Sequence, residues 1–257
     1  SDKVHKVTII HTNIMNAKVC LSVCLSVSLL PLHDKLFPYA EEHVQKFLES
    51  EWEKDEVKEA VAALRKLALE DQENKVDGVI SGLVGNVKWQ MSADRKAGPL
   101  KKLQGLIWKQ GYDNGDIKGH VYDDVAPALE QWRSTDGQKV YIYSSGSVQA
   151  QKLLFGQSLA GDLLPRIDGH FDTAVGQKQE AASYTAIAEK IEVKPEEILF
   201  LTDIVKEAEA AAAAGLQAAL VSRAGNAPLP AELAFPVLHS FAQLSSNKRK
   251  PEPQVTI

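Results

Sequence analysis

One stretch decides the fold class: Lys139-Val140-Tyr141-Ile142-Tyr143-Ser144-Ser145-Gly146-Ser147. Its first half is β-branched and aromatic, which is typical of a buried strand. A glycine-bearing turn follows, and the apolar spacing of residues 148–157 predicts a helix. In open α/β sheets, anions bind where the carboxyl end of a strand faces the amino terminus of a helix. The stretch therefore predicts an α/β fold with an anion site at this turn.

A second strand of the same kind, residues 198–202, ends in Asp203. From residue 112 onward, strand-like and helix-like segments alternate, which predicts a parallel sheet with helices on both faces. The quoted stretch supplies the strand 140–144. Further strands are expected at Val4–Ile10, 217–221 and 234–238, with a short extended piece around Phe171. Helices are expected at 125–134, 148–157, 180–191 and 206–214.

Between the first strand and this alternation, four amphipathic helices are expected at about 36–50, 54–70, 76–92 and 99–110. Consecutive helices without an intervening strand predict a small bundle. The expected architecture is a Rossmann-like parallel-sheet core with an inserted all-helical cap. The core covers residues 1–34 and 112–244, the cap covers residues 35–111, and residues 245–257 are expected to form a disordered tail.

Composition excludes several classes of function. The 257 residues carry a net charge of -5, and without a basic excess we expect neither nucleic acid nor an anionic membrane as partner. The two cysteines, Cys20 and Cys24, do not make a disulfide framework, which favours a reducing cytosolic setting. The apolar run 19–32 has 14 residues, whereas a membrane helix needs about 20.

Four polar residues are candidates for the site. The hydroxyls of Ser144 and Ser145 either form hydrogen bonds within the turn after the strand or bind phosphate oxygens. Asp203 is either the N-cap of the following helix or a ligand of Mg²⁺, which prefers carboxylate oxygens. Lys178 is either a solvated surface lysine or the cation that neutralises a bound phosphate.

The order strand–Ser, Lys before a helix, strand–Asp resembles the second, third and fourth motifs of the haloacid dehalogenase-like phosphohydrolases. Within that superfamily, the chain resembles the enolase-phosphatases, also called acireductone synthases, from about Leu36 to Phe241. The stretches that carry this closer resemblance are 140–156, 168–173 and 198–203 in the core, 36–39 and 89–96 in the cap, and the closing loop 223–227.

The resemblance implies a bifunctional reaction of methionine salvage. The family converts 2,3-diketo-5-methylthiopentyl-1-phosphate to the acireductone 1,2-dihydroxy-3-keto-5-methylthiopentene, first enolising the diketone and then removing the phosphate. It implies that Ser144, Ser145 and Lys178 bind the substrate phosphate and that Asp203 holds one Mg²⁺ per subunit. It also implies a monomer in the cytoplasm, and in the nucleus as well.

The chain departs from the family at the first motif, an Asp-x-Glu-Gly-Thr run after strand one whose Asp is the nucleophile. With Val4–Ile10 as that strand, His11 and Asn13 stand at the Asp and Glu positions. Residues 11–32 also contain a direct repeat, Cys-Leu-Ser-Val at 20–23 and 24–27.

We expect this anomalous segment, residues 11–32, to come from a mispredicted stretch of the gene; the alternative is an inactive paralogue that binds phosphate ligands. Read literally, the loss of the nucleophile lowers phosphatase activity by roughly 10⁴–10⁶, and no catalytic residue is assigned. A nucleotide-binding α/β domain is disfavoured because no glycine-rich turn follows strand one.

Overall fold

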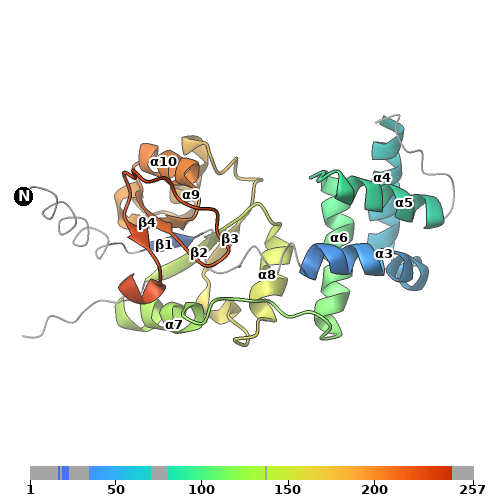
Figure 1. Ribbon diagram of the computed structural model, residues 1–257, viewed down its shortest axis with the longest axis horizontal. Coiled ribbons are helices and arrows are strands. Elements are labelled where there is room, and N and C mark those ends of the chain that lie inside the picture. The colour runs from blue at the N-terminus through green and yellow to red at the C-terminus, as the bar shows by residue number, and fades with distance from the viewer. Residues whose placement is uncertain (1–16, 18, 23–34, 71–79, 137, 245–257) are drawn as a thin grey trace, which may run out of the picture. The chain divides into compact units, whose positions relative to one another are not determined.

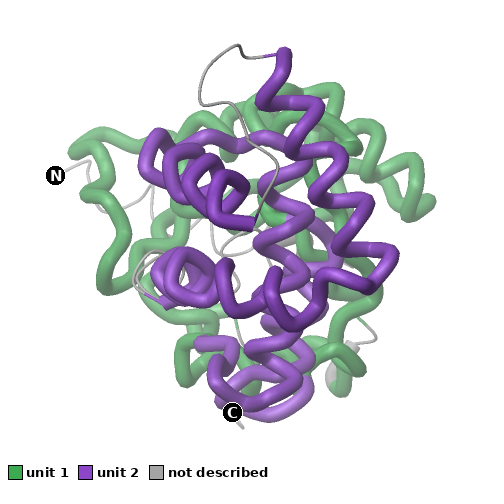
Figure 2. Tube along the Cα trace, turned by 90° about the vertical axis from the view of Figure 1, so that its right-hand side faces the viewer, with its two compact units in different colours: residues 1–26, 121–146, 163–257 green, residues 27–120, 147–162 purple. Residues whose placement is uncertain are grey.

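The computed structural model describes residues 17, 19–22, 35–70, 80–136 and 138–244. These residues form two compact units (Figure 2). Unit 1 comprises the described residues of 1–26, 121–146 and 163–257, and unit 2 comprises those of 27–120 and 147–162. The predicted tail, residues 245–257, lies outside the described residues.

Unit 1 is built on a six-stranded sheet with the order β3-β2-β1-β4-β5-β6, in which all neighbouring strands are parallel (Figure 1). The strands are β1 Val19–Ser22, β2 Lys139–Tyr143, β3 Gly169–Phe171, β4 Ile198–Thr202, β5 Gln217–Val221 and β6 Val237–Leu238. Every residue of β4 is buried, as is β2 after Lys139. Such continuous burial is expected for parallel strands covered on both faces, and the predicted parallel sheet is confirmed.

Helices cover the two faces of this sheet. Helices α9 Ala181–Ile191 and α10 Val205–Ala213 lie on one face, and α7 Val125–Asp136 lies on the other (Figure 1). Short 3₁₀ helices are present at Leu164–Arg166, Pro195–Glu197 and Phe241–Leu244. The core beneath α9 and α10 is rich in aromatic side chains and includes Tyr141, Tyr143, Tyr184 and Phe200. Alternate residues of β2 therefore point into this aromatic core.

The central strand differs from the expectation. The predicted strand Val4–Ile10 lies outside the described residues, and the strand between β2 and β4 is Val19–Ser22, from the segment regarded as anomalous. Val-Cys-Leu-Ser is short and apolar enough to pair on both sides, so it serves as a parallel strand. His11 and Asn13 precede β1 in the chain, and their expected place after the strand Val4–Ile10 also lies outside the described residues.

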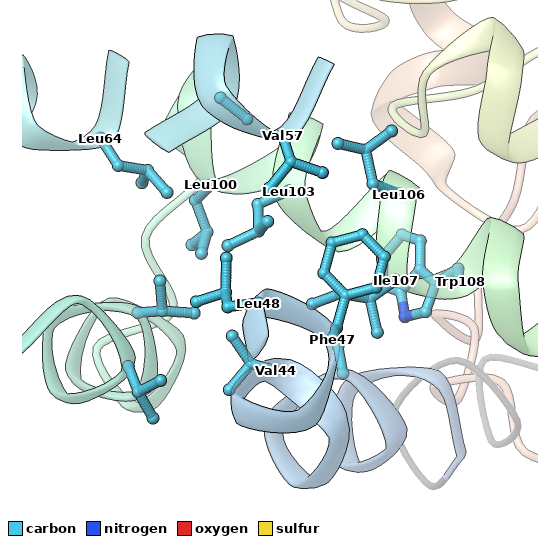
Figure 3. Close-up of a cluster of buried hydrophobic side chains, with 14 of the residues drawn as sticks. Val44, Phe47, Leu48, Val57, Leu64, Leu100, Leu103, Leu106, Ile107 and Trp108 are labelled. Carbon is cyan, nitrogen blue, oxygen red and sulfur yellow. The ribbon is translucent and has the colours of Figure 1, made fainter. Parts of the chain in front are cut away.

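Unit 2 is all-helical, and the four predicted helices are confirmed in the described residues as α3 Phe37–Glu51, α4 Asp55–Glu70, α5 Ile80–Ser92 and α6 Gly98–Asp113. A fifth helix, α8 Val148–Gly156, belongs to the same unit. The apolar stripes of these helices form one core, part of which is drawn in Figure 3, including Val44, Leu48, Val57, Leu64 and Leu103. No helix in the described part of the chain is long and apolar enough to cross a bilayer.

Candidate active site

The turn after β2 contains Ser144 and Ser145, whose side chains differ in their hydrogen bonds. Ser144 donates its backbone N–H to Phe171 O over 3.1 Å, and its Oγ accepts from the N–H of Gly146 over 3.2 Å. The side chain of Ser144 therefore holds the turn, as one of the two readings predicted. Ser145 is exposed, and its hydroxyl has no hydrogen-bond partner among the described residues. The hydroxyl of Ser145 is thus available to a ligand.

Asp203 follows β4 and does not cap the next helix. The N-cap residue of α10 is Ile204, and no side chain caps that helix. The N–H of Ile204 instead donates to Thr202 Oγ1 over 3.1 Å. Asp203 Oδ2 accepts from Asn226 Nδ2 over 2.6 Å. The helix-cap reading of Asp203 is therefore wrong, and its Oδ1 is left to face other ligands.

Lys178 is half-buried and forms an ion pair with a buried carboxylate. Its Nζ lies 2.6 Å from Glu207 Oε1, and the two side chains are only 17% and 5% exposed. The other carboxylate oxygen of Glu207 accepts from Thr202 Oγ1 over 2.7 Å. A buried charge is tolerated when it is paired and hydrogen-bonded, and both conditions are met here. The reading of Lys178 as a solvated surface lysine is wrong.

Hydrogen bonds join these residues across the sheet edge. Tyr143, the neighbour of Ser144, donates from its hydroxyl to Gly176 O over 2.8 Å. Two residues further on, Lys178 reaches Glu207, which binds Thr202, the neighbour of Asp203. One short segment thus connects the end of β2 to the end of β4.

The central strand β1 lies between these two ends. Ser22 pairs in register with Ile142 on one side and Leu201 on the other, two residues before Ser144 and Asp203 respectively. The chain runs from β1 to β2 and β3 on one side, and then to β4 on the other. Ligands of open α/β sheets bind at such a reversal of strand order, outside the carboxyl ends of the strands.

Two residues of this edge were missed by the sequence interpretation, Glu207 and Asn226. Glu207 lies in the first turn of α10, where acidic residues are common because they interact favourably with the helix dipole, so its position gave no separate signal for the site. Asn226 lies in the loop 223–227, which was noted only as a likeness to the family. Its contact with Asp203 spans 23 positions of sequence and has no local signal.

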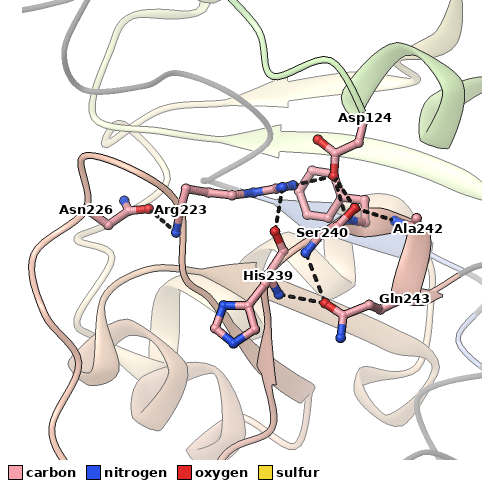
Figure 4. A network of polar contacts seen from close by, with 8 residues as sticks. Asp124, Arg223, Asn226, His239, Ser240, Ala242 and Gln243 are labelled. Atoms are coloured by element: carbon pink, nitrogen blue, oxygen red, sulfur yellow. Dashed lines mark hydrogen bonds and ion pairs between the residues drawn. The ribbon is translucent and has the colours of Figure 1, made fainter.

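Arg223 anchors the loop that carries Asn226 (Figure 4). Its Nη2 lies 2.8 Å from Asp124 Oδ2, and its Nη1 donates to His239 O over 2.8 Å. The guanidinium also lies over the ring of Phe241, 4.7 Å from the centroid. The backbone N–H of Arg223 donates to Asn226 Oδ1 over 2.7 Å. The same arginine therefore binds the body of unit 1 and orients the amide that contacts Asp203.

One carboxylate oxygen of Asp124 accepts several hydrogen bonds. Its Oδ2 accepts from Ser240 Oγ and from the N–H of Phe241, each over 2.8 Å, besides its pair with Arg223. Burial by itself raises the pKa of this carboxyl, but the hydrogen bonds from Ser240, Arg223 and Phe241 outweigh it, and the pKa of Asp124 is lowered. The carboxylate is therefore stabilised in its charged form.

The described residues supply part of a site that fits Mg²⁺. Mg²⁺ is commonly bound through one or two carboxylates, water and substrate phosphate. Asp203 supplies one such carboxylate, whereas both oxygens of Glu207 are engaged by Lys178 and Thr202. No group of three or more His, Cys, Asp or Glu side chains gathers among the described residues, so a cage made wholly of protein ligands is not formed there.

Comparison with known proteins gives consistent results. Residues 22–215 match the model of the haloacid dehalogenase-like hydrolases. The chain is 49% identical over 248 residues to enolase-phosphatase E1 of Anopheles gambiae. This match covers 91% of this chain and 84% of that relative. It is 52% identical over 224 residues to enolase-phosphatase E1 of Aedes aegypti, a match covering 82% of this chain and 20% of that longer protein.

Among solved structures, the chain is similar to the UTR4 protein (unknown transcript 4 protein) of Saccharomyces cerevisiae. The TM-score is 0.74 at 32% sequence identity, and the match covers 88% of this chain and 98% of that one. The similarity therefore spans both the sheet unit and the helical unit of the fold.

Proposed function

Because this chain belongs to the enolase-phosphatase E1 family of the haloacid dehalogenase-like hydrolases, we propose that it converts 2,3-diketo-5-methylthiopentyl-1-phosphate to 1,2-dihydroxy-3-keto-5-methylthiopentene in methionine salvage. The observation that carries the proposal is the set of contacts that joins Tyr143, Lys178, Glu207 and Thr202. These contacts bring a serine pair, a lysine and an aspartate to one sheet edge, as a phosphate site with an adjacent cation requires.

In this proposal, Ser144, Ser145 and Lys178 bind the phosphate of the substrate. The exposed hydroxyl of Ser145 donates to one phosphate oxygen, and Lys178 supplies positive charge from a position fixed by Glu207. Asp203 holds one Mg²⁺ per subunit, which when bound neutralises charge on the phosphate. Asn226 keeps the Asp203 carboxylate oriented through the bond to Oδ2.

The attacking group is expected after the central strand. That strand ends at Ser22, and residues 23–34 lie outside the described residues, so no residue is assigned as the nucleophile. The expected loss of activity rests on His11 and Asn13 at the positions of the first motif, and both residues lie outside the described part of the chain.

We also propose the wider organisation that the family resemblance implies. Residues 1–34 and 112–244 form the phosphatase core, and residues 35–111 form a cap over the substrate. The protein acts as a cytoplasmic monomer, and also in the nucleus, on a small phosphorylated molecule, without nucleic acid or membrane as partner.

The proposal is tested by incubating the full chain with the diketone phosphate and Mg²⁺ while inorganic phosphate and acireductone are measured. We expect release of both, dependent on Mg²⁺. Asp203→Asn and Lys178→Met should each lower the rate by at least about 100-fold, since each removes a group that stabilises charge in the transition state. Lys190→Met, at an exposed lysine near the end of α9, is the matched control and should leave the rate unchanged.

Absence of phosphate release would contradict the enzymatic proposal. If the same preparation then bound inorganic phosphate with millimolar or better affinity, the result would indicate the alternative of a non-catalytic phosphate-binding paralogue. The similarity to enolase-phosphatases over most of the chain does not favour that alternative.

A further inference from the structure

Three consecutive carbonyls beside the site each accept a hydrogen bond from a side-chain hydroxyl. They belong to residues 176–178, here called the lysine segment because it ends in Lys178. Tyr143 donates to the first carbonyl over 2.8 Å, Ser183 to the second over 2.7 Å, and Tyr184 to the third over 2.5 Å. The donors come from two elements, since Tyr143 ends β2 and the other two lie in the first turn of α9.

These donors are themselves fixed by packing. Tyr143 and Tyr184 are fully buried and Ser183 is 1% exposed. The ring of Tyr184 packs edge-on against Tyr143 with 5.7 Å between centroids and against Phe200 with 4.9 Å. Burial raises the pKa of both tyrosines, so the two phenols keep their protons and remain donors. The hydroxyls thus form a rigid set of anchors.

The first residue of the lysine segment is a glycine that packs closely against Ser183. Gly176 has φ +141°, a conformation that side chains rarely adopt. A Cβ built on it would lie 2.1 Å from Ser183 Oγ. Only glycine therefore allows the segment to lie this close to α9.

Both ends of Lys178 are held as a result. Its carbonyl is bound by Tyr184, and its ammonium is bound by Glu207 over 2.6 Å. A lysine that is free to rotate loses rotamer entropy when it binds an anion, and this loss opposes binding. A lysine whose backbone and head group are already fixed avoids most of that loss.

We propose that the hydroxyls of Tyr143, Ser183 and Tyr184 are positioning residues for Lys178, fixing its backbone so that its ammonium meets the phosphate of the substrate. The inference rests on the proposed function, because it takes Lys178 as a phosphate ligand. None of the three hydroxyls needs to touch the substrate; each acts through the lysine segment.

The test measures the affinity of the full chain for inorganic phosphate by calorimetry. Tyr184→Phe and Tyr143→Phe each remove one hydroxyl and keep the ring, and each should weaken binding about threefold to tenfold, the effect of one hydrogen bond. Tyr141→Phe is the matched control: it lies two residues before Tyr143 in β2, is 9% exposed, and its hydroxyl makes no hydrogen bond among the described residues. It should bind phosphate as the unchanged chain does.

A second background separates positioning from a general loss of packing. In Lys178→Met, adding Tyr184→Phe should cause no further loss of phosphate affinity, because the group through which Tyr184 acts is gone. Equal phosphate affinity of Tyr184→Phe and Tyr141→Phe would overturn the proposal. So would a Tyr184→Phe effect that persists undiminished in Lys178→Met.

If the unchanged, folded chain binds no measurable phosphate, hydrogen exchange of the amides at 176–180 decides the positioning role, and the release of phosphate from the substrate decides the proposed function separately. Faster exchange there in Tyr184→Phe than in Tyr141→Phe supports anchoring of the lysine segment. Equal exchange rates in the two variants overturn it.

Discussion

Asn226 donates from its side-chain amide to Asp203 Oδ2 over 2.6 Å, while its amide oxygen accepts from the backbone N–H of Arg223 over 2.7 Å. The second bond fixes which end of the amide faces Asp203. One carboxylate oxygen of Asp203 is therefore occupied and its orientation set, and in the function proposed above the other oxygen binds Mg²⁺. Groups that orient a metal ligand in this way affect affinity nearly as much as the ligand itself.

We predict that Asn226→Ala lowers the affinity for Mg²⁺ about tenfold, because Asp203 loses its orienting partner. The measurement is the rise in melting temperature of the protein as Mg²⁺ is titrated. Asn114→Ala, at the exposed C-terminal end of α6, is the control and should titrate like the unchanged chain. An Mg²⁺ midpoint shared by the Asn226 and Asn114 variants would show that Asp203 needs no orientation.

Asp124→Asn should lower the free energy of unfolding by about 3 kcal/mol, since it leaves the nearly buried guanidinium of Arg223 without its counter-ion. Urea denaturation measures the effect. Asp123→Asn is the control, because Asp123 is exposed and should change stability by no more than about 0.5 kcal/mol. Similar losses in the two variants would mean that the Arg223 pair contributes little.

The pKa of Asp124 also predicts how stability depends on pH. Because its pKa is lowered in the folded protein, the carboxylate contributes stability above its unfolded pKa of about 3.9. This contribution is lost as the pH falls from about 4 through the lower folded-state pKa. Unfolding free energies measured between pH 6 and pH 3 should therefore fall less steeply in Asp124→Asn than in the unchanged chain; parallel curves would refute the assignment.

Two glycines should respond in opposite ways to alanine. Gly85 is exposed inside α5 with open space where a Cβ would be, so Gly85→Ala should raise the free energy of unfolding by about 0.5–1 kcal/mol. Gly176→Ala meets Ser183 and a φ of +141°, and should lower it by more than about 1 kcal/mol. Thermal or urea unfolding of both variants tests the signs, and a stabilising Gly176→Ala would contradict the close packing of the lysine segment.

Much of the fold was predictable because its signals are local. The β-branched run that ends at Tyr143 and the apolar run that ends at Thr202 are strands, as expected, since continuous apolar runs suit strands buried on both faces. The helical period located α3, α4 and α6 within a few residues. The central strand was missed because Val19–Ser22 and Val4–Ile10 are both short runs that suit a strand, and neither sequence shows by itself whether it pairs with β2 and β4.

By itself, the sequence determined the α/β class and the inserted helices, because these depend on periodicity. It also indicated Ser144 and Asp203, because each is a polar residue at a strand end, whereas Lys178 became a candidate only through its place in the family-like order of motifs. Only the tertiary structure decided which partner each candidate contacts. Asp203 accepts a hydrogen bond from Asn226, and Lys178 forms an ion pair with Glu207. These partners are 23 and 29 positions away, and only the packing of the sheet and its helices brings such distant groups within hydrogen-bond distance.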